Sequence, residues 1–215
     1  MKPNRYGISR PYETRLPLPI VVVVCDDKKT AVAYFTELKR EVKAKVTLHV
    51  EKAACHGATA VEVVSTARRK AAELVENRAE EEMVCRDAVW ALIDLESESD
   101  RQDKARCAKT GAEKHGVCVA LSNPCFEVWT LAHLADTGED FSDCEAVIKR
   151  MKAEWKRTFA TEFQKKKAQA DYSKLMEFRT QAIQRCKKRC QRDPSWTEVY
   201  KVVELIESLC NDGGL

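Results

Sequence analysis

Short runs of apolar residues, separated by stretches with a helical pattern, constrain this chain most strongly. Residues 20–25 read IVVVVC, residues 88–93 read AVWALI, residues 117–121 read VCVAL, and a weaker run covers residues 45–50. Continuous apolar runs of this length are typical of strands that are buried on both faces of a sheet. The alternation of strand and helix therefore predicts an α/β fold in which helices flank a parallel sheet.

Local signals place helix ends between these strands. Thr59 and Glu62 have the spacing of a capping box, which predicts a helix that begins there and runs to about residue 82. A polar helix over residues 99–115 is expected to end at Gly116, because glycine readily adopts the left-handed conformation that often follows a helix. Both signals support the alternation of strands and helices.

The helices in the second half of the chain are predicted less directly. Asn123 is expected to cap the helix that follows the strand at 117–121, with Pro124 in its first turn. Residues 143–190 have a helical pattern throughout, and the motif Gln191–Pro194 interrupts it. The remaining predicted helices cover residues 30–43 and about 195–210.

The 215 residues suit one good-sized domain, or a domain with an appended subdomain. Residues 1–18 are expected to be a flexible N-terminal segment, residues 19–140 the α/β domain, and residues 141–215 a basic helical extension that packs back on the core. No run of about 18 apolar residues is present, and the polar N-terminal segment has no apolar stretch of the signal-peptide kind. We therefore expect a cytoplasmic protein with no membrane contact.

The ten cysteines are scattered along the chain without a CxxC pair. Paired cysteines at that spacing are the usual signature of a zinc site, so the pattern disfavours one. In a reducing cytosol most of these residues are expected to be free thiols that act as small core side chains.

Acidic residues follow two of the predicted strands. Asp26 and Asp27 come directly after residues 20–25, and Asp94 and Glu96 follow residues 88–93. In a sheet of order 2-1-3-4 these two strands are neighbours, about 4.8 Å apart, so four carboxylates would share one crevice. A divalent cation would offset their repulsion, and oxygen ligands suit Mg²⁺ or Mn²⁺.

Two activities fit an acidic cluster at this edge of a sheet. One is nuclease or phosphoryl-transfer chemistry, in which a metal ion polarises a phosphate and activates water. The other is a phosphoacceptor receiver domain, which further needs a hydroxyl after the fourth strand and a lysine after a fifth. Ser122 could supply the hydroxyl, but no fifth strand ending in lysine is predicted. The receiver interpretation is therefore disfavoured.

Residues 149–192 contain fifteen basic and four acidic residues. By itself such a segment is often a solvated helix face. Next to an acidic metal crevice it is better explained as a surface for nucleic acid or a partner protein, because a polyanion needs nearby cations. The residues predicted to bind nucleic acid are Lys165, Lys166, Lys167, Lys187, Lys188 and Arg189.

Three segments resemble motifs of the RloB-like proteins. Residues 122–129, SNPCFEVW, are similar to the family motif SNPCFELW; residues 25–35, CDDKKTAVAYF, resemble CEGxxTExxYF; and residues 93–96, IDLE, stand where the family has FDxD. The resemblance covers roughly residues 18–210 and is weakest over 140–190. It implies a Toprim-type fold, an association with restriction and anti-phage loci, and metal-dependent nuclease activity.

The resemblance also assigns roles to individual residues. Asp26 matches the glutamate expected to act as general acid or base, Asp94 and Glu96 match the metal-binding DxD pair, and Glu127 matches the motif glutamate, a candidate for catalysis or further metal ligation. His56 could shuttle a proton or contact phosphate, although a loop role is more common for such a residue.

The chain departs from the family pattern at its acidic positions. Asp26 is one methylene shorter than the family glutamate, Glu96 is one methylene longer than the family aspartate, and Asp27 replaces a glycine. Two hypotheses follow. One is a Mg²⁺- or Mn²⁺-dependent nuclease of a prokaryotic defence system that acts on RNA or DNA. The other is a catalytically degenerate Toprim module that binds nucleic acid or a defence-system partner protein without cleavage.

Overall fold

The computed structural model describes residues 17–26, 29–53, 58–77, 86–96, 99–136, 138–163, 171–189 and 193–212, with the side chains of 99–101 left out. No helix in these ranges is long and apolar enough to cross a membrane.

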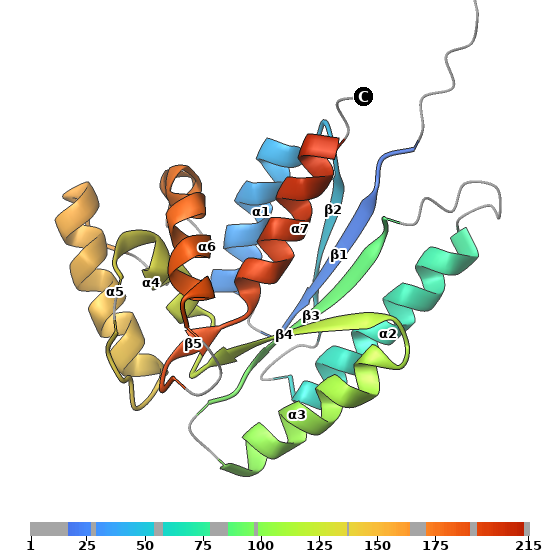
Figure 1. Cartoon of the computed structure of the whole chain (residues 1–215), viewed down its shortest axis with the longest axis horizontal. Helices are drawn as coiled ribbons and strands as arrows, with labels where there is room; N and C mark the ends of the chain where they lie inside the picture. The colour runs from blue at the N-terminus through green and yellow to red at the C-terminus, as the bar shows by residue number, and fades with distance from the viewer. Residues whose placement is uncertain are drawn as a thin grey trace, which may run out of the picture.

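A five-stranded sheet of order β2-β1-β3-β4-β5 forms the centre of the molecule (Figure 1). The first four strands are parallel to their neighbours, and β5 pairs antiparallel to β4. The prediction of an α/β fold with the order 2-1-3-4 is therefore confirmed. The strands are β1 (Ile20–Cys25), β2 (Thr47–Lys52), β3 (Ala88–Asp94), β4 (Val117–Asn123) and β5 (Trp196–Thr197).

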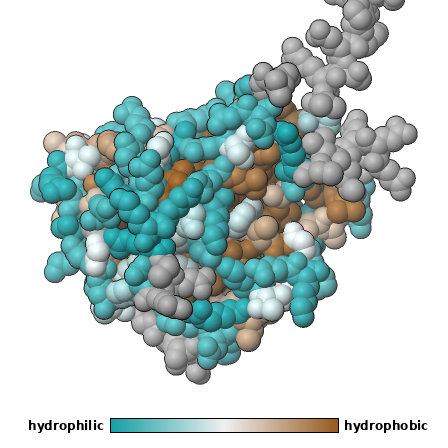
Figure 2. Space-filling model, in the orientation of Figure 1, coloured by the Kyte–Doolittle hydropathy of each residue, from teal (hydrophilic) through white to brown (hydrophobic). Residues whose placement is uncertain are grey.

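Helices cover both faces of this sheet (Figure 1). On one face lie α2 (Ala60–Asn77) and α3 (Ser99–Glu113). Apolar residues of the other face share one core with α1 (Thr30–Val42), α4 (Glu127–Leu134), α5 (Cys144–Phe159), the 3₁₀ helix η2 (Tyr172–Phe178), α6 (Arg179–Lys187) and α7 (Val199–Asp212). Figure 2 shows hydrophilic side chains over most of the outer helices and apolar side chains mainly near the centre.

The side chains of β1 explain why this strand is apolar at every position. Val21 and Val23 point into the core that contains α1 and α4, whereas Val22 and Val24 belong to the core beneath α2 and α3. Successive side chains of a strand point to opposite faces, so a strand that is covered on both sides needs no polar position. The burial also fixes the place where β1 ends, since Asp26 is the first polar residue after it.

The capping signals of α2 and α3 are confirmed. The Thr59 backbone N–H donates to Glu62 Oε2 at 2.7 Å, and the Glu62 N–H donates back to Thr59 Oγ1 at 3.3 Å. Gly116, which follows α3, has a left-handed φ of 70°. Helix α2 extends to Asn77, and the predicted continuation to residue 82 lies outside the described residues.

The prediction of one helical segment over residues 143–190 is wrong. Helix α5 ends at Phe159 because Ala160 adopts a left-handed φ of 53°. Beyond this turn Phe163 and Tyr172 pack edge-on against Trp155, with ring centroids 5.1 and 6.4 Å away. This aromatic packing requires the chain to fold back, and tertiary contacts of this kind override local helix propensity.

The prediction that Asn123 caps the next helix is also wrong. Helix α4 begins only at Glu127, and its N-cap residue Phe126 makes no side-chain capping bond. The Asn123 side-chain amide instead donates to the Pro194 carbonyl at 2.6 Å. Asn123 therefore attaches the segment before β5 to the end of β4.

The final helix was predicted from about residue 195, but Trp196 and Thr197 form β5 and α7 begins at Val199. Ser122 and Thr197 share a hydrogen bond between their hydroxyls at 2.8 Å. Glu198 is buried and accepts the Leu121 N–H at 3.2 Å. These contacts fix the closing segment to β4, and the proposed boundary near residue 140 stays a prediction.

Candidate functional site at the carboxyl ends of the strands

Asp26 and Asp94 lie at the ends of neighbouring strands. Cys25 of β1 is in register with Leu92 of β3, so the residue after β1 lies beside the end of β3. Asp26 Oδ2 accepts the backbone N–H of Asp94 at 2.9 Å. The structure thus brings together two of the predicted site residues, at the edge of the sheet where ligands of parallel α/β proteins bind.

Glu96 follows β3 in a left-handed backbone conformation with a φ of 50°. Its N–H donates to the Pro124 carbonyl at 2.9 Å, and its own carbonyl accepts the Gln102 side-chain amide at 3.2 Å. Its side chain is exposed. A non-glycine residue in this region costs about 1–3 kcal/mol and is often found at functional sites. The two hydrogen bonds hold Glu96 in this conformation.

Glu127 is the first residue of α4 and is only 2% exposed. Its Oε1 accepts the hydroxyl of Thr30, the first residue of α1, at 3.0 Å. Its Oε2 accepts the thiol of Cys144, the first residue of α5, at 3.5 Å. Three helix N-termini therefore surround this carboxylate, and their dipoles favour negative charge.

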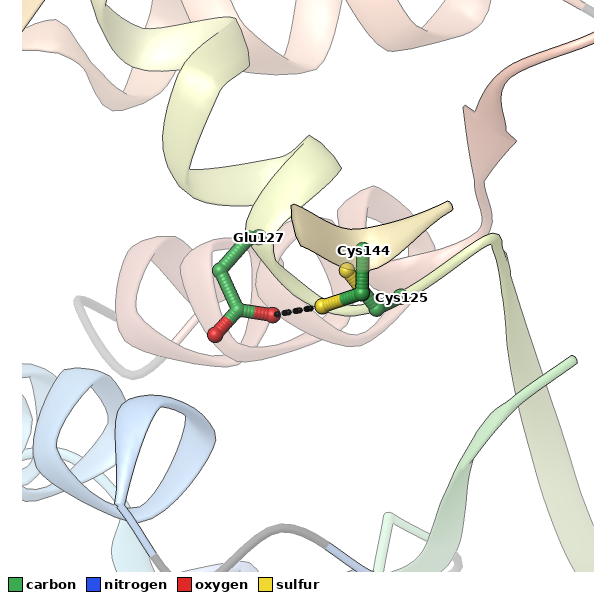
Figure 3. Close-up of side chains that lie close together, drawn as sticks. All are labelled: Cys125, Glu127 and Cys144. Carbon is green, nitrogen blue, oxygen red and sulfur yellow. Dashed lines mark hydrogen bonds between the residues drawn. The ribbon is translucent and has the colours of Figure 1, made fainter. Parts of the chain in front are cut away.

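Cys125, Glu127 and Cys144 form a compact group (Figure 3). One ligand atom from each of the three lies within 4.8 Å of the others, and Cys144 Sγ is directed at the Glu127 carboxylate. Cys125 is 2% exposed. The pKa of its thiol lies far above the usual range, because the hydrogen bond to Cys144, burial, and the charges of Glu127 and Asp94 all favour the neutral form. Asp94 therefore influences this group electrostatically.

This group was not predicted from the sequence. The absence of a CxxC pair disfavoured a metal site with sulfur ligands, but Cys125 and Cys144 come from separate segments that meet only in the folded chain. A partial signal was present, since Cys125 lies two positions before Glu127 in the motif at 122–129. The place of Cys144 at the start of α5 could not be inferred from spacing.

The two sets of candidate ligands differ in chemistry. Asp26, Asp94 and Glu96 offer oxygen atoms, which suit Mg²⁺ or Mn²⁺, and Mg²⁺ commonly takes one or two carboxylates plus water. Among the described residues these three acids do not form a second group of the kind made by Cys125, Glu127 and Cys144. Their donor chemistry fits the predicted cation, and their role as its ligands stays a prediction.

Most of the predicted nucleic-acid contacts are outside the described residues or engaged in ion pairs. Lys165, Lys166 and Lys167 lie outside the described residues, as do His56 and Asp27. Lys187 pairs with Glu204, and Arg189 pairs with Asp136 at 3.4 Å. Lys188 is exposed. The surface role of this segment stays a prediction.

Other basic residues of the 149–192 segment also bind acidic side chains or backbone carbonyls. The buried carboxylate of Glu154 pairs with Arg150 at 2.9 Å and with Arg157 at 2.6 Å. Arg185 donates to the backbone carbonyls of Ala132 and His133 at the end of α4. Some basic residues of this segment therefore stabilise the packing of α4, α5 and α6 through ion pairs and hydrogen bonds.

The bond between Asp26 and Asp94 gives a stability prediction. Asp26→Ala removes the acceptor of the Asp94 N–H, and we expect the free energy of unfolding to fall by about 1–3 kcal/mol. Asp26→Asn keeps an acceptor oxygen of the same reach and should lose less than about 1 kcal/mol. Urea denaturation of both variants measures this difference. An equal loss in both variants would show that the charge of Asp26, rather than its hydrogen bond, stabilises the fold.

The fold and the site define an α/β protein with acidic residues collected at the carboxyl ends of a mainly parallel sheet. Within that class the chain belongs to the family of RloB-like proteins, whose model matches residues 21–206. No curated protein and no solved structure gave a significant match.

Proposed function

We propose that this protein is a divalent-metal-dependent nuclease of a prokaryotic anti-phage defence system that acts on RNA or DNA. The observation that carries the proposal is the hydrogen bond from Asp94 N–H to Asp26 Oδ2, which places the acids of β1 and β3 side by side. Membership of the RloB-like family supports it, since the resemblance of residues 25–35, 93–96 and 122–129 to motifs of that family implies metal-dependent nuclease activity.

Within this proposal each acidic residue has a distinct role. Asp94 and Glu96 would hold Mg²⁺ or Mn²⁺, which when bound polarises a phosphate and lowers the pKa of water. Asp26 would accept the proton of the attacking water, and its hydrogen bond to Asp94 N–H keeps the carboxylate oriented. Glu127, fixed by Thr30 and Cys144, would contribute negative charge behind this pair.

The chain would hold a polyanionic substrate with basic residues near its C-terminal helices. Lys188 is exposed at the end of α6, and Lys165, Lys166 and Lys167 are further candidates. Their contribution would be largely independent of base sequence, because it is directed at phosphate. Recognition of a particular nucleic acid would then require other features or a defence-system partner protein.

A second candidate function is a nucleic-acid-binding or partner-binding module without catalysis. It is favoured by the hydrogen bonds of the acids themselves. Asp26 binds a backbone N–H, and both oxygens of the buried Glu127 accept bonds from neighbouring side chains. These bonds stabilise the fold without any metal, so the same acids could persist after loss of activity.

A cleavage assay separates the two functions. The full chain is incubated with mixed RNA and DNA substrates in Mg²⁺, in Mn²⁺ and with a chelator. We expect metal-dependent cleavage that Asp26→Asn slows by at least about a hundredfold, because general-base catalysis contributes roughly 10²–10⁴. The product ends, read by gel electrophoresis and mass spectrometry, identify the bond that is hydrolysed.

The matched control is Asp212→Asn, which makes the same chemical change at an exposed residue. Asp212 pairs with Arg86 just before β3 begins, and so lies at the opposite end of the sheet. The Asp212→Asn protein should cleave nucleic acid at the rate of the wild type. If the wild type and the variants all bind nucleic acid without cleaving it, the nuclease proposal is wrong and the binding module is supported. Equal cleavage by wild type and Asp26→Asn would point to a contaminating enzyme.

A further inference from the structure

We propose that Cys125, Glu127 and Cys144 form a binding site for Zn²⁺. Glu127 is the one ligand that also has a part in the proposed nuclease, and zinc binding by this group does not depend on nuclease activity. It is built by two segments of the chain, the motif before and at the start of α4 and the first residue of α5 (Figure 3).

The ligand distances are close to those of a zinc site. Bonds of about 2.0–2.3 Å in a tetrahedral arrangement separate neighbouring ligand atoms by roughly 3.3–3.8 Å. The distance from Cys144 Sγ to Glu127 Oε2 is 3.5 Å, and all three ligand atoms lie within 4.8 Å of one another. Binding therefore requires the ligand atoms to approach one another by no more than about 1 Å.

The donor atoms select the metal. Two cysteine sulfurs and one carboxylate oxygen form a soft, negatively charged ligand set, which favours Zn²⁺ over Mg²⁺. Two of the ligands, Cys125 and Glu127, are each 2% exposed, so the site is well shielded from water. Three protein ligands leave one coordination position open, as in zinc sites where water or substrate occupies the fourth position.

The packing around the site positions the ligands in advance. Asp143 caps α5 by accepting the Ala146 N–H at 2.8 Å, which fixes the residue immediately before Cys144. Thr30 holds the other oxygen of Glu127 at 3.0 Å and leaves Oε2 directed at Cys144. Bound zinc would link the starts of α4 and α5 and should raise the temperature at which the protein unfolds.

Cobalt substitution tests the proposal in the full-length reduced protein. Co²⁺ bound by thiolates gives a charge-transfer band in the ultraviolet, and titration with Zn²⁺ should remove it. We expect one metal per chain, and an affinity reduced by at least about tenfold in Cys125→Ser and Cys144→Ser, since loss of even an outer-shell partner costs about 10–100-fold. Glu127→Gln should weaken binding but keep the charge-transfer band.

Two matched controls make the same substitution elsewhere. Cys186 is buried like Cys125, and Cys210 is partly buried like Cys144. Cys186→Ser and Cys210→Ser should bind Co²⁺ and Zn²⁺ like the wild type. An unchanged spectrum and affinity in both Cys125→Ser and Cys144→Ser would overturn the proposal, and so would equal losses in the two controls.

A measurement on the wild type covers the case in which a variant does not fold. Alkylation by a small thiol reagent, mapped by mass spectrometry, should be slowed at Cys144 by Zn²⁺ and unchanged at Cys210. Mg²⁺ at the same concentration should protect neither residue. If Cys144 reacts equally fast with and without Zn²⁺, the proposal is wrong, whatever the outcome of the nuclease assay.

Discussion

Replacing Asp94 with alanine is expected to lower metal-dependent cleavage by roughly a thousandfold or more. A bound divalent ion stabilises transition-state charge by several kcal/mol, and each 1.36 kcal/mol corresponds to a factor of ten in rate. Asp94 is the last residue of β3 and accompanies Asp26 at the edge of the sheet. Among the acids that are proposed to bind the cation, Asp94 is the one that lies within a strand.

The measurement combines kinetics with metal affinity. Mn²⁺ binding, followed by electron paramagnetic resonance, should weaken in Asp94→Ala in parallel with the rate. Asp212→Ala is the control, since it makes the same substitution at an aspartate that lies at the other end of the sheet. Circular dichroism tests whether the fold is retained. A folded Asp94→Ala protein that cleaves at the wild-type rate would exclude Asp94 as a metal ligand and remove the basis of the nuclease proposal.

The length of the Asp26 side chain affects its hydrogen bond to the backbone of β3. Asp26 is one methylene shorter than the glutamate of the motif that it resembles, and at this length its Oδ2 accepts the Asp94 N–H at 2.9 Å. The shorter aspartate is thus suited to the hydrogen bond seen here. In the sequence this position shows only a change of length, and its contact with the backbone of β3 becomes evident in the folded chain.

The sheet could be predicted from the sequence because strands that are buried on both faces appear there as continuous apolar runs. The valines of β1 alternate between two cores, so no polar residue interrupts the run until Asp26. The parallel direction of β1, β2, β3 and β4 then follows from the helices between the strands. Capping residues such as Thr59 and Glu62 are equally readable, because their hydrogen bonds are local.

The features that were not predicted all depend on contacts between distant segments. Strand β5 has two residues, and it exists because Thr197 and Glu198 bond to Ser122 and Leu121 of β4. The group of Cys125, Glu127 and Cys144 likewise forms only when α5 packs beside α4. Neither has a periodic pattern or a fixed spacing, which are the signals that a single sequence offers.

His133 illustrates the same dependence in the core beneath the site. It is 1% exposed, and its ring lies edge-on to Trp129 at a centroid distance of 4.7 Å. Its Nδ1 is 2.9 Å from the Trp129 carbonyl, and its Nε2 is 3.3 Å from the Tyr34 hydroxyl. A carbonyl can only accept, so Nδ1 carries the proton and Nε2 of the neutral ring accepts from Tyr34.

This environment predicts that acid destabilises the protein well above the range in which carboxylates titrate. Burial, together with the nearby charges of Arg179 and Arg185, lowers the pKa of His133 from 6.5 to about 3, although the bond to the Trp129 carbonyl opposes this shift. Below pH 6.5 the unfolded chain takes up a proton that the folded chain does not. The unfolded state binds more protons, so the free energy of unfolding falls as the pH falls.

The expected loss is about 1.4 kcal/mol per pH unit, or about 2 kcal/mol between pH 6.5 and about pH 5. Denaturation in urea across this range measures it. His133→Phe keeps an aromatic ring but cannot titrate; it should be less stable near pH 7 by about 1–3 kcal/mol, because the Tyr34 hydroxyl loses its acceptor. Its stability should then decline less with acid than that of the wild type.

The control is His115→Gln, at a histidine whose side chain is exposed in the folded protein. Because this side chain lies outside the core, the variant should keep the decline of the wild type. An equally steep decline in His133→Phe would mean that His133 is protonated within the folded core. The hydrogen bond from the Tyr34 hydroxyl to a neutral His133 ring would then not account for the loss of stability in acid.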